Sequence, residues 1–375
     1  MKAHWRRIQH AAAAAAIFAA TSTKYSQKQK QRCHWYQSVY WYKWRHFSLR
    51  HWDDAKICFL CCFSKTEIQQ LLPLLQLEKI QWTARNHSSM KTALCLLLCQ
   101  LTYSEWLMVI ADHFNCSPSW CSLVFNDVAV HLWTTFRGIL EWHPLLNYEK
   151  MAHYAEAISD LIESRDGCEP PGFVTGEGSA VFWGFVDGTF WGFCRPTGYE
   201  QQRSTYSGHK KDNGQKWQAV VTPDGLVLSL IGPFLGPVND WAIWRRSQLT
   251  ERIQEIMKGN PTLYLYEDPS YKHSYGIIAP FQHSRGWFAL EPWQQKTNER
   301  LSSARITVEH AFGHTQVLWT YTAYGKGLRA GSSPVAAYFA AAILFTNCLT
   351  CIQGNQTSQQ FVIDPPSLEQ YLLTD

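Results

Sequence analysis

Three acidic residues from distant parts of the chain have the residue types needed for chemistry on a phosphodiester. Asp187 interrupts the apolar, aromatic run FVDGTFWGF, Asp268 ends the run TLYLYED, and Glu309 stands four residues after an arginine in RITVEH. Clustered carboxylates repel one another, so they are stable together only when they are protonated or bridged by cations. Mg²⁺ and Mn²⁺ prefer oxygen ligands and would satisfy them. Two such ions about 4 Å apart can activate a water and stabilise the leaving oxygen of a phosphodiester.

Each of these acids also has a plainer interpretation. The Asp-Gly sequence at 187 is typical of turns, the Asp-Pro sequence at 268 is typical of loops, and Glu309 could be a solvated helix residue. Asp240 is a fourth candidate metal ligand. Its place at the start of a predicted helix fits an N-cap better, so it ranks below the other three.

A basic segment lies between the first two predicted strands and adjoins the acids. Its cations are Arg195, Arg203, His209, Lys210, Lys211 and Lys216, opposed only by Glu200 and Asp212. We predict that Arg203 and the three lysines contact DNA phosphates, and a solvated basic loop is the alternative. The formal net charge of +4 and the pI of about 8.4 permit a nucleic-acid partner without requiring one.

The elements that must position these residues follow from the periodicity of the sequence after residue 180. Strands are predicted at 180–193, 214–223, 226–234 and 262–268, and a Pro-Asp-Gly turn joins the second and third into a hairpin. One helix is predicted at 239–259, capped by Asn239 or Asp240, and another from Arg300 onward. This order predicts a mixed α/β sheet covered by helices, with the three acids at one edge of the sheet.

The chain before this sheet is predicted to be helical. Helices are expected at 93–101, 104–114 and 119–133, with Ser104 and Ser117 as N-caps and Pro118 in a first turn. The last two, within residues 91–137, have the spacing of a helix-turn-helix, in which Ser119 and Trp120 would contact DNA. Any all-helical domain also contains such helix pairs, so an ordinary helical domain is the alternative.

Composition divides the chain into four parts. Residues 1–32 are predicted to be low-complexity and disordered, 33–162 a helical domain, 163–180 a linker rich in Gly, Pro and acids, and 181–375 the α/β domain. The basic, alanine-rich start has the outline of a signal peptide, so export is a less favoured alternative. No later stretch is expected to span a membrane. The twelve cysteines show no repeated spacing and are interpreted as buried thiols of a reduced protein.

Six short segments resemble the nuclease domain of PIF/Harbinger-type DDE transposases, in a form seen in fungal genomes. In order they are FVDGTFW, GHKKDNGQKWQAVVTPDGLV, GPVNDW, YEDPSY, RITVEHAFG and GNQTSQQFVIDPPSLEQYL. The resemblance runs from about Val181 to Leu373, with a compatible helix-turn-helix before it. It implies an RNase H-like nuclease fold and a catalytic triad of Asp187, Asp268 and Glu309. Arg305 would complete the family's Arg-x-x-x-Glu signature and lie at the DNA.

The resemblance also implies an activity and partners. A water activated at the metal site would cut double-stranded DNA at transposon ends, and the freed 3′-hydroxyl would attack target DNA without a covalent protein intermediate. Asp187 and Asp268 would hold two Mg²⁺ or Mn²⁺ ions between them, and Glu309 would complete one coordination sphere. A separate Myb-like DNA-binding protein and a nuclear location are implied as well, and a homo-oligomer is left open.

Two positions depart from the family's pattern. Gln316 stands where the family often has a lysine, seven residues after the triad glutamate, and Glu267 replaces a glycine before the second aspartate. The first change removes a cation that could contact phosphate, and the second adds an acid that could crowd the site. Neither deletes a triad member, so an active enzyme is the favoured expectation. A domesticated or decayed copy that binds DNA without cutting is the alternative.

Overall fold

The structure is a computed structural model that describes residues 47–83, 86–166, 173–175, 178–258, 263–269, 271, 273–282, 290–323 and 328–373. The predicted low-complexity segment 1–32 and its signal-like outline lie outside these residues.

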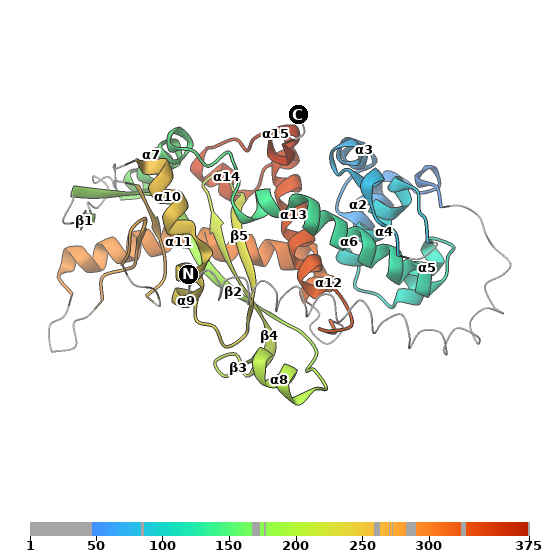
Figure 1. The fold of residues 1–375 in the computed structure, drawn as a ribbon. Helices are drawn as coiled ribbons and strands as arrows, with labels where there is room; N and C mark the ends of the chain where they lie inside the picture. Colours follow the sequence, from blue (N-terminus) through green and yellow to red (C-terminus); the bar gives the residue numbers. More distant parts are fainter. Residues whose placement is uncertain are drawn as a thin grey trace.

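The fold is built on a mixed sheet in which five strands lie side by side in the order β5, β4, β2, β6 and β7 (Figure 1). Their bounds are Val227–Leu235, Asp212–Val221, Gly178–Gly192, Leu263–Tyr266 and Ile277–Ile278. β2 pairs antiparallel with β4 and parallel with β6. The short strands β1 (Phe173–Thr175) and β3 (Tyr206–Ser207) pair with β2 and with the start of β4. The predicted mixed α/β class and the predicted hairpin are confirmed.

The centre of this sheet is apolar on both faces. In β4 all residues from Asn213 to Val221 except Lys216 are buried, and β2 buries Trp183, Phe185 and Val186 completely. A strand that is buried on both faces lacks the apolar-polar alternation of a half-exposed strand. A charged residue in such a strand is therefore held away from bulk water.

The helices after the strands differ in detail from the prediction. They are α9 (Asp240–Ser247), α10 (Leu249–Met257), α11 (Pro292–Leu318), α12 (Thr320–Ala323), α13 (Val335–Gln353), α14 (Gln356–Phe361) and α15 (Leu368–Leu372). The single helix expected at 239–259 is wrong, because Gln248 adopts a left-handed conformation with φ 61° and separates α9 from α10. α11 begins at a proline eight residues before Arg300, since proline suits a first helical turn.

The helices before the sheet are α2 (Asp54–Cys61), α3 (Lys65–Leu74), α4 (Met90–Thr102), α5 (Leu107–His113), α6 (Pro118–Glu141) and α7 (Tyr148–Asp166). Ser117 caps α6 as predicted, by accepting a hydrogen bond from the Trp120 amide. The prediction for Ser104 is wrong, because α5 starts at Leu107 with Trp106 in the N-cap position. The expected linker 163–180 contains the last turn of α7, all of β1 and the start of β2.

Helix α6 is a core element for most of its length. Between Trp120 and Trp133 none of its residues is exposed, and it packs against α4, α13 and β5. A recognition helix needs an exposed face to enter a major groove. The helix pair α5–α6 therefore has the order of a helix-turn-helix, whereas a DNA-reading role for it stays a prediction.

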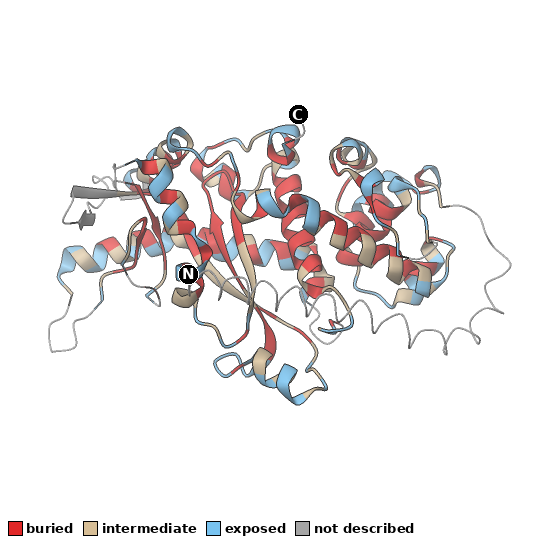
Figure 2. Ribbon diagram, in the orientation of Figure 1, coloured by how far each residue is buried: buried red, intermediate tan, exposed pale blue. Residues whose placement is uncertain are grey.

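Helix α13 connects the helical region to the sheet. Figure 2 shows buried residues continuing from the central strands through α13 into α6. The expectation that no later stretch could span a membrane is wrong if only length and composition are considered. Helix α13, Val335–Gln353, is long and apolar enough to cross a membrane. In the structure 83% of its apolar window is buried inside the protein, as in a core helix, and such a helix is weak evidence for a membrane span.

A small projection carries the basic segment away from the sheet. Helix α8 (Tyr199–Thr205), β3 and the start of β4 extend beyond the main body in Figure 1. Arg203, His209, Lys210 and Lys211 are exposed there. No residue of α8 is buried, so this helix is open to a partner.

Candidate active site

Asp187 and Asp268 lie side by side because of the strand register. β2 and β6 are parallel, with Phe185 opposite Tyr266, and each aspartate follows its strand partner by two residues. Side chains two residues apart point to the same face, and neighbouring strands are about 4.8 Å apart. Asp187, within β2, and Asp268, two residues beyond the end of β6, therefore lie close together, and their charges interact.

The Asp187 carboxyl is only partly accessible, with 20% of its side chain exposed. Burial raises its pKa from 3.8 to about 6, and the nearby carboxylates of Asp268 and Asp240 add to the rise. The Arg305 guanidinium and the Gly188 amide, which donates to Asp187 Oδ1 at 2.7 Å, oppose this effect. Asp187 is therefore mostly ionised at neutral pH and takes up a proton just below it.

Arg305 connects the first and third acids of the predicted triad. Its Nη1 donates to Asp187 Oδ2 at 3.3 Å and its Nη2 donates to Glu309 Oε1 at 2.9 Å. The pair Arg305 and Glu309 is one helical turn apart on α11, so both side chains point to the same face. One guanidinium thus brings together acids that are 122 residues apart in the sequence.

Asp240 also reaches this site, although its predicted N-cap role belongs to another residue. Asn239 caps α9 by accepting a hydrogen bond from the Ala242 amide at 2.8 Å. The freed Asp240 carboxylate lies over Gly188, where a Cβ would come within 2.4 Å of Asp240 Oδ1. Lys216 of β4 donates to the same oxygen at 3.2 Å. Only glycine after Asp187 leaves room for this fourth carboxylate.

Glu267 is the least expected acid at the site. It is fully buried, and neither of its oxygens accepts a hydrogen bond from any described residue. Burial raises its pKa to about 10, and the negative charges of Asp268 and Asp187 add to the rise. Glu267 is therefore a neutral acid at physiological pH. The expected crowding is resolved by protonation.

Two neutral residues that the sequence did not single out support the same edge of the sheet. Gln218 of β4, opposite Gly188, donates from Nε2 to the Tyr271 hydroxyl at 2.7 Å. Burial raises the pKa of Tyr271 well above its usual value, and the charge of Asp240 adds to the rise. The segment YEDPSY contained Tyr271, but nothing in its spacing indicated that the ring would be buried beside the acids.

The oxygen donors of this site suit hard divalent cations. In the structure Arg305 and Lys216 pair with three of the acids, Asp187, Glu309 and Asp240. Four carboxylates supply only oxygen donors, which Mg²⁺ and Mn²⁺ prefer. Within the described part of the chain, no group of three His, Cys, Asp or Glu side chains is close enough to hold a metal ion. The nearest cation to Asp187 and Glu309 is instead the Arg305 guanidinium.

The residues predicted to contact DNA divide into two sets. Lys210, Lys211 and Arg203 are exposed on the projection. By contrast, Lys216 and Arg305 have only 16% and 18% of their side chains exposed and are paired with site acids.

Ser119 and Trp120 lie at the start of α6, apart from the projection. Ser119 is exposed, whereas Trp120 is partly buried against the hydrophobic core. Nothing in these positions identifies a DNA contact, so that role stays a prediction.

The part of the sequence that contains this site is similar to a known protein family. Residues 186–347 match the family described as DDE superfamily endonuclease. The matched region contains all four aspartates and glutamates at the site surface, namely Asp187, Asp240, Asp268 and Glu309, together with Arg305. No curated protein and no solved structure gives a significant match. Residues 186–347 are therefore similar to DDE superfamily endonucleases.

Proposed function

We propose that this protein is a metal-dependent DNA endonuclease that acts as a transposase of the PIF/Harbinger type. The observation that carries the proposal is that Asp187 lies near Asp268 and shares the Arg305 guanidinium with Glu309, within the region that matches the DDE endonuclease family. Endonucleases of this superfamily generally use divalent metal ions. The proposed substrate is double-stranded DNA at transposon ends, followed by joining to target DNA.

The proposed roles follow from the positions of the acids. Asp187 and Asp268 would hold the ions between them, Glu309 would complete one site, and Asp240 is a further candidate ligand. When bound, divalent ions would lower the pKa of the attacking water and stabilise the leaving oxygen. Arg305 holds Asp187 and Glu309 near each other. On metal binding, the ion would replace the Arg305 guanidinium as the partner of these carboxylates.

The projection offers a surface for the DNA backbone. Lys210 and Lys211 are exposed on the turn before β4, and β4 leads directly to Lys216 beside Asp240. Phosphate contacts made by lysines position a duplex without reading its sequence. We propose that DNA follows this path from the projection to the acids.

Further parts of the proposal rest on the family resemblance. They are an RNase H-like nuclease fold, two Mg²⁺ or Mn²⁺ ions, a Myb-like DNA-binding partner, a nuclear location and action as a homo-oligomer. The helix pair α5–α6 remains the proposed helix-turn-helix.

A non-catalytic DNA-binding protein, as a domesticated or decayed transposase, is the second candidate. One observation favours it: the Arg305 guanidinium already satisfies Asp187 and Glu309, so two of the acids are neutralised without an ion. Both candidates bind DNA through the same projection, and only the first cuts it.

The experiment that separates them is Mn²⁺-dependent nicking of supercoiled DNA by the purified protein. We expect Asp268→Asn to abolish nicking while DNA affinity stays nearly unchanged, because the substitution removes a ligand charge and keeps the side-chain shape. Asp160→Asn on the exposed face of α7 is the matched control and should nick like the wild type.

The outcomes are distinct. Nicking that needs both Mn²⁺ and Asp268 supports the endonuclease. Wild-type activity in Asp268→Asn would show that the triad assignment is wrong. DNA binding without nicking under any metal condition would favour the non-catalytic candidate.

A further inference from the structure

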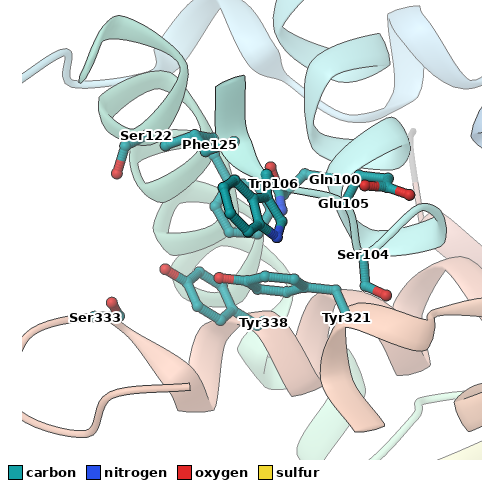
Figure 3. Close-up of a pocket in the computed structure, with 10 residues that line it drawn as sticks. Gln100, Ser104, Glu105, Trp106, Ser122, Phe125, Tyr321, Ser333 and Tyr338 are labelled. Carbon is teal, nitrogen blue, oxygen red and sulfur yellow. The ribbon is translucent and has the colours of Figure 1, made fainter. Parts of the chain in front are cut away.

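A pocket away from the acids lies where the helical region meets α12 and α13. Its volume is about 440 Å³, within the range of small-molecule sites. Figure 3 shows side chains from the α4–α5 connection, from α6 and from the chain around α12 and α13 facing one space. The proposed nuclease chemistry does not use any of them.

Aromatic rings form the floor of this pocket. Phe125 packs against Tyr338 with ring centroids 4.7 Å apart and against Tyr321 at 5.4 Å. The two tyrosine rings are 5.7 Å apart. The Tyr338 hydroxyl donates to Asn126, which fixes the orientation of that ring. The floor is therefore a rigid aromatic surface that exists before anything binds.

Trp106 forms the opposite side, and 80% of its surface is exposed. It occupies the N-cap position of α5, yet its side chain makes no capping hydrogen bond. Among the described residues its indole contacts no other aromatic ring. Exposure of a tryptophan beside an aromatic floor is unfavourable in water, and a flat ligand stacked on the indole would relieve it.

One polar group of the pocket is a buried acceptor without a donor among the described residues. Gln100 is 3% exposed, and its buried Oε1 accepts no hydrogen bond from the described residues. A buried acceptor left unpaired costs free energy, which a ligand N–H would recover. The Glu105 carboxylate lines the same space; it accepts a hydrogen bond from the Tyr103 hydroxyl and can accept a further one.

An exposed arginine lies on a turn beside the pocket. Ser333 lines it, and the Ser333 amide donates to the Arg329 carbonyl at 3.0 Å in a tight turn. Arg329 is exposed on this turn. A nucleotide whose base entered the pocket would have an arginine close to its backbone.

We propose that this pocket binds one unpaired nucleobase of the DNA, with its flat face stacked on Trp106 and an amino group directed at Gln100 and Glu105. This inference rests on the proposed function, because it takes DNA as the substrate. A base has both a π face and an edge amino group, whereas a tryptophan or tyrosine of a partner protein offers a single N–H or O–H. Adenine, cytosine and guanine have the amino group and thymine lacks it.

The test compares two fluorescein-labelled duplexes of one sequence, fully paired or with one extrahelical adenine, bound to the full chain in EDTA. Fluorescence anisotropy gives the two dissociation constants. We expect the wild type to prefer the duplex with the extrahelical adenine by roughly 10-fold, the usual scale of base stacking on an aromatic side chain. Trp106→Ala and Gln100→Ala should each reduce this preference and leave affinity for the paired duplex unchanged.

Phe59→Ala is the matched control, because Phe59 is an exposed aromatic residue of the same helical region outside the pocket. It should keep the preference, and an extrahelical thymine should give a smaller one.

Equal affinity of the wild type and Trp106→Ala for the duplex with the extrahelical base would overturn the pocket and leave the proposed function standing. In that case a partner's aromatic side chain would be the better occupant. Failure of the wild type to bind either duplex would instead overturn the proposed function, and this inference with it.

Discussion

At the scale of single residues, two cations pair with three of the acids at the site. Arg305 pairs with Asp187 and Glu309, and Lys216 pairs with Asp240. Glu267 has no such partner and remains protonated. A buried acid can be neutralised by a nearby cation or by a proton. Both occur at this site.

Glu267 makes folding stability depend on pH. Its pKa is raised to about 10 in the folded protein, while the unfolded chain loses this proton above about pH 4.5. The stabilisation is therefore fully present below about pH 4.5 and is lost as the pH rises toward 10. Between about pH 6 and pH 8 the wild type should lose roughly 2–3 kcal/mol of unfolding free energy because of this group. Glu267→Gln should not show this loss. Urea unfolding in EDTA at both pH values measures this.

Glu163→Gln provides the comparison for this prediction, because Glu163 is an exposed glutamate on α7. Its stability should change with pH as the wild type does. If Glu267→Gln and the wild type lose the same unfolding free energy over this pH range, Glu267 is not held protonated by the fold.

At the scale of elements, four segments bring the site together: the middle of β2, the residues just after β6, the first turn of α9 and the middle of α11. The sequence predicted the strands and their neighbours, because short continuous apolar runs and a Pro-Asp-Gly turn are local signals. It also placed Asp187 beside Asp268. Arg305 was known from the family signature, but its two ion pairs depend on how α11 lies against β2.

The position of Asp240 could not be predicted for a related reason. Asn239 and Asp240 both have side chains that suit an N-cap. Because α9 takes Asn239 as its N-cap, Asp240 becomes the first helical residue and its side chain lies at the site instead. The missing side chain of Gly188 marks that approach. A glycine after a buried aspartate was therefore a signal of close contact, which the turn interpretation hid.

The projection of α8 and β3 should control binding to any duplex. The double substitution Lys210→Ala with Lys211→Ala should weaken binding to all DNA sequences alike and reduce the slope of log affinity against log salt by about 2. The reason is that each lysine neutralises one phosphate and releases its counterions. Filter binding over a salt series measures the slope.

Lys65→Ala with Lys79→Ala changes the net charge equally in the helical region and should leave the slope nearly unchanged. An unchanged slope for the projection variant would place the DNA path elsewhere on the protein.

At the scale of the whole molecule, the helical region and the sheet share one hydrophobic core through α13. Phe339 lies at the centre of the connection, with its ring 3.9 Å from Trp191 and 5.0 Å from Trp217. On its other side α13 packs against α6. Two regions joined by such a core should unfold together, whatever their separate roles on DNA.

Phe339→Ala tests this directly. The substitution leaves a cavity beside two buried tryptophans, so it should lower the free energy of unfolding by about 3–5 kcal/mol. Tryptophan fluorescence, which reports on the tertiary environment of the 18 tryptophans spread over both regions, and far-ultraviolet circular dichroism, which reports mainly on the helices, should shift to the same lower midpoint in urea. Phe59→Ala removes the same side chain from an exposed position of α2 and should cost much less. Separate midpoints for the two signals would mean that the protein does not unfold as one cooperative unit.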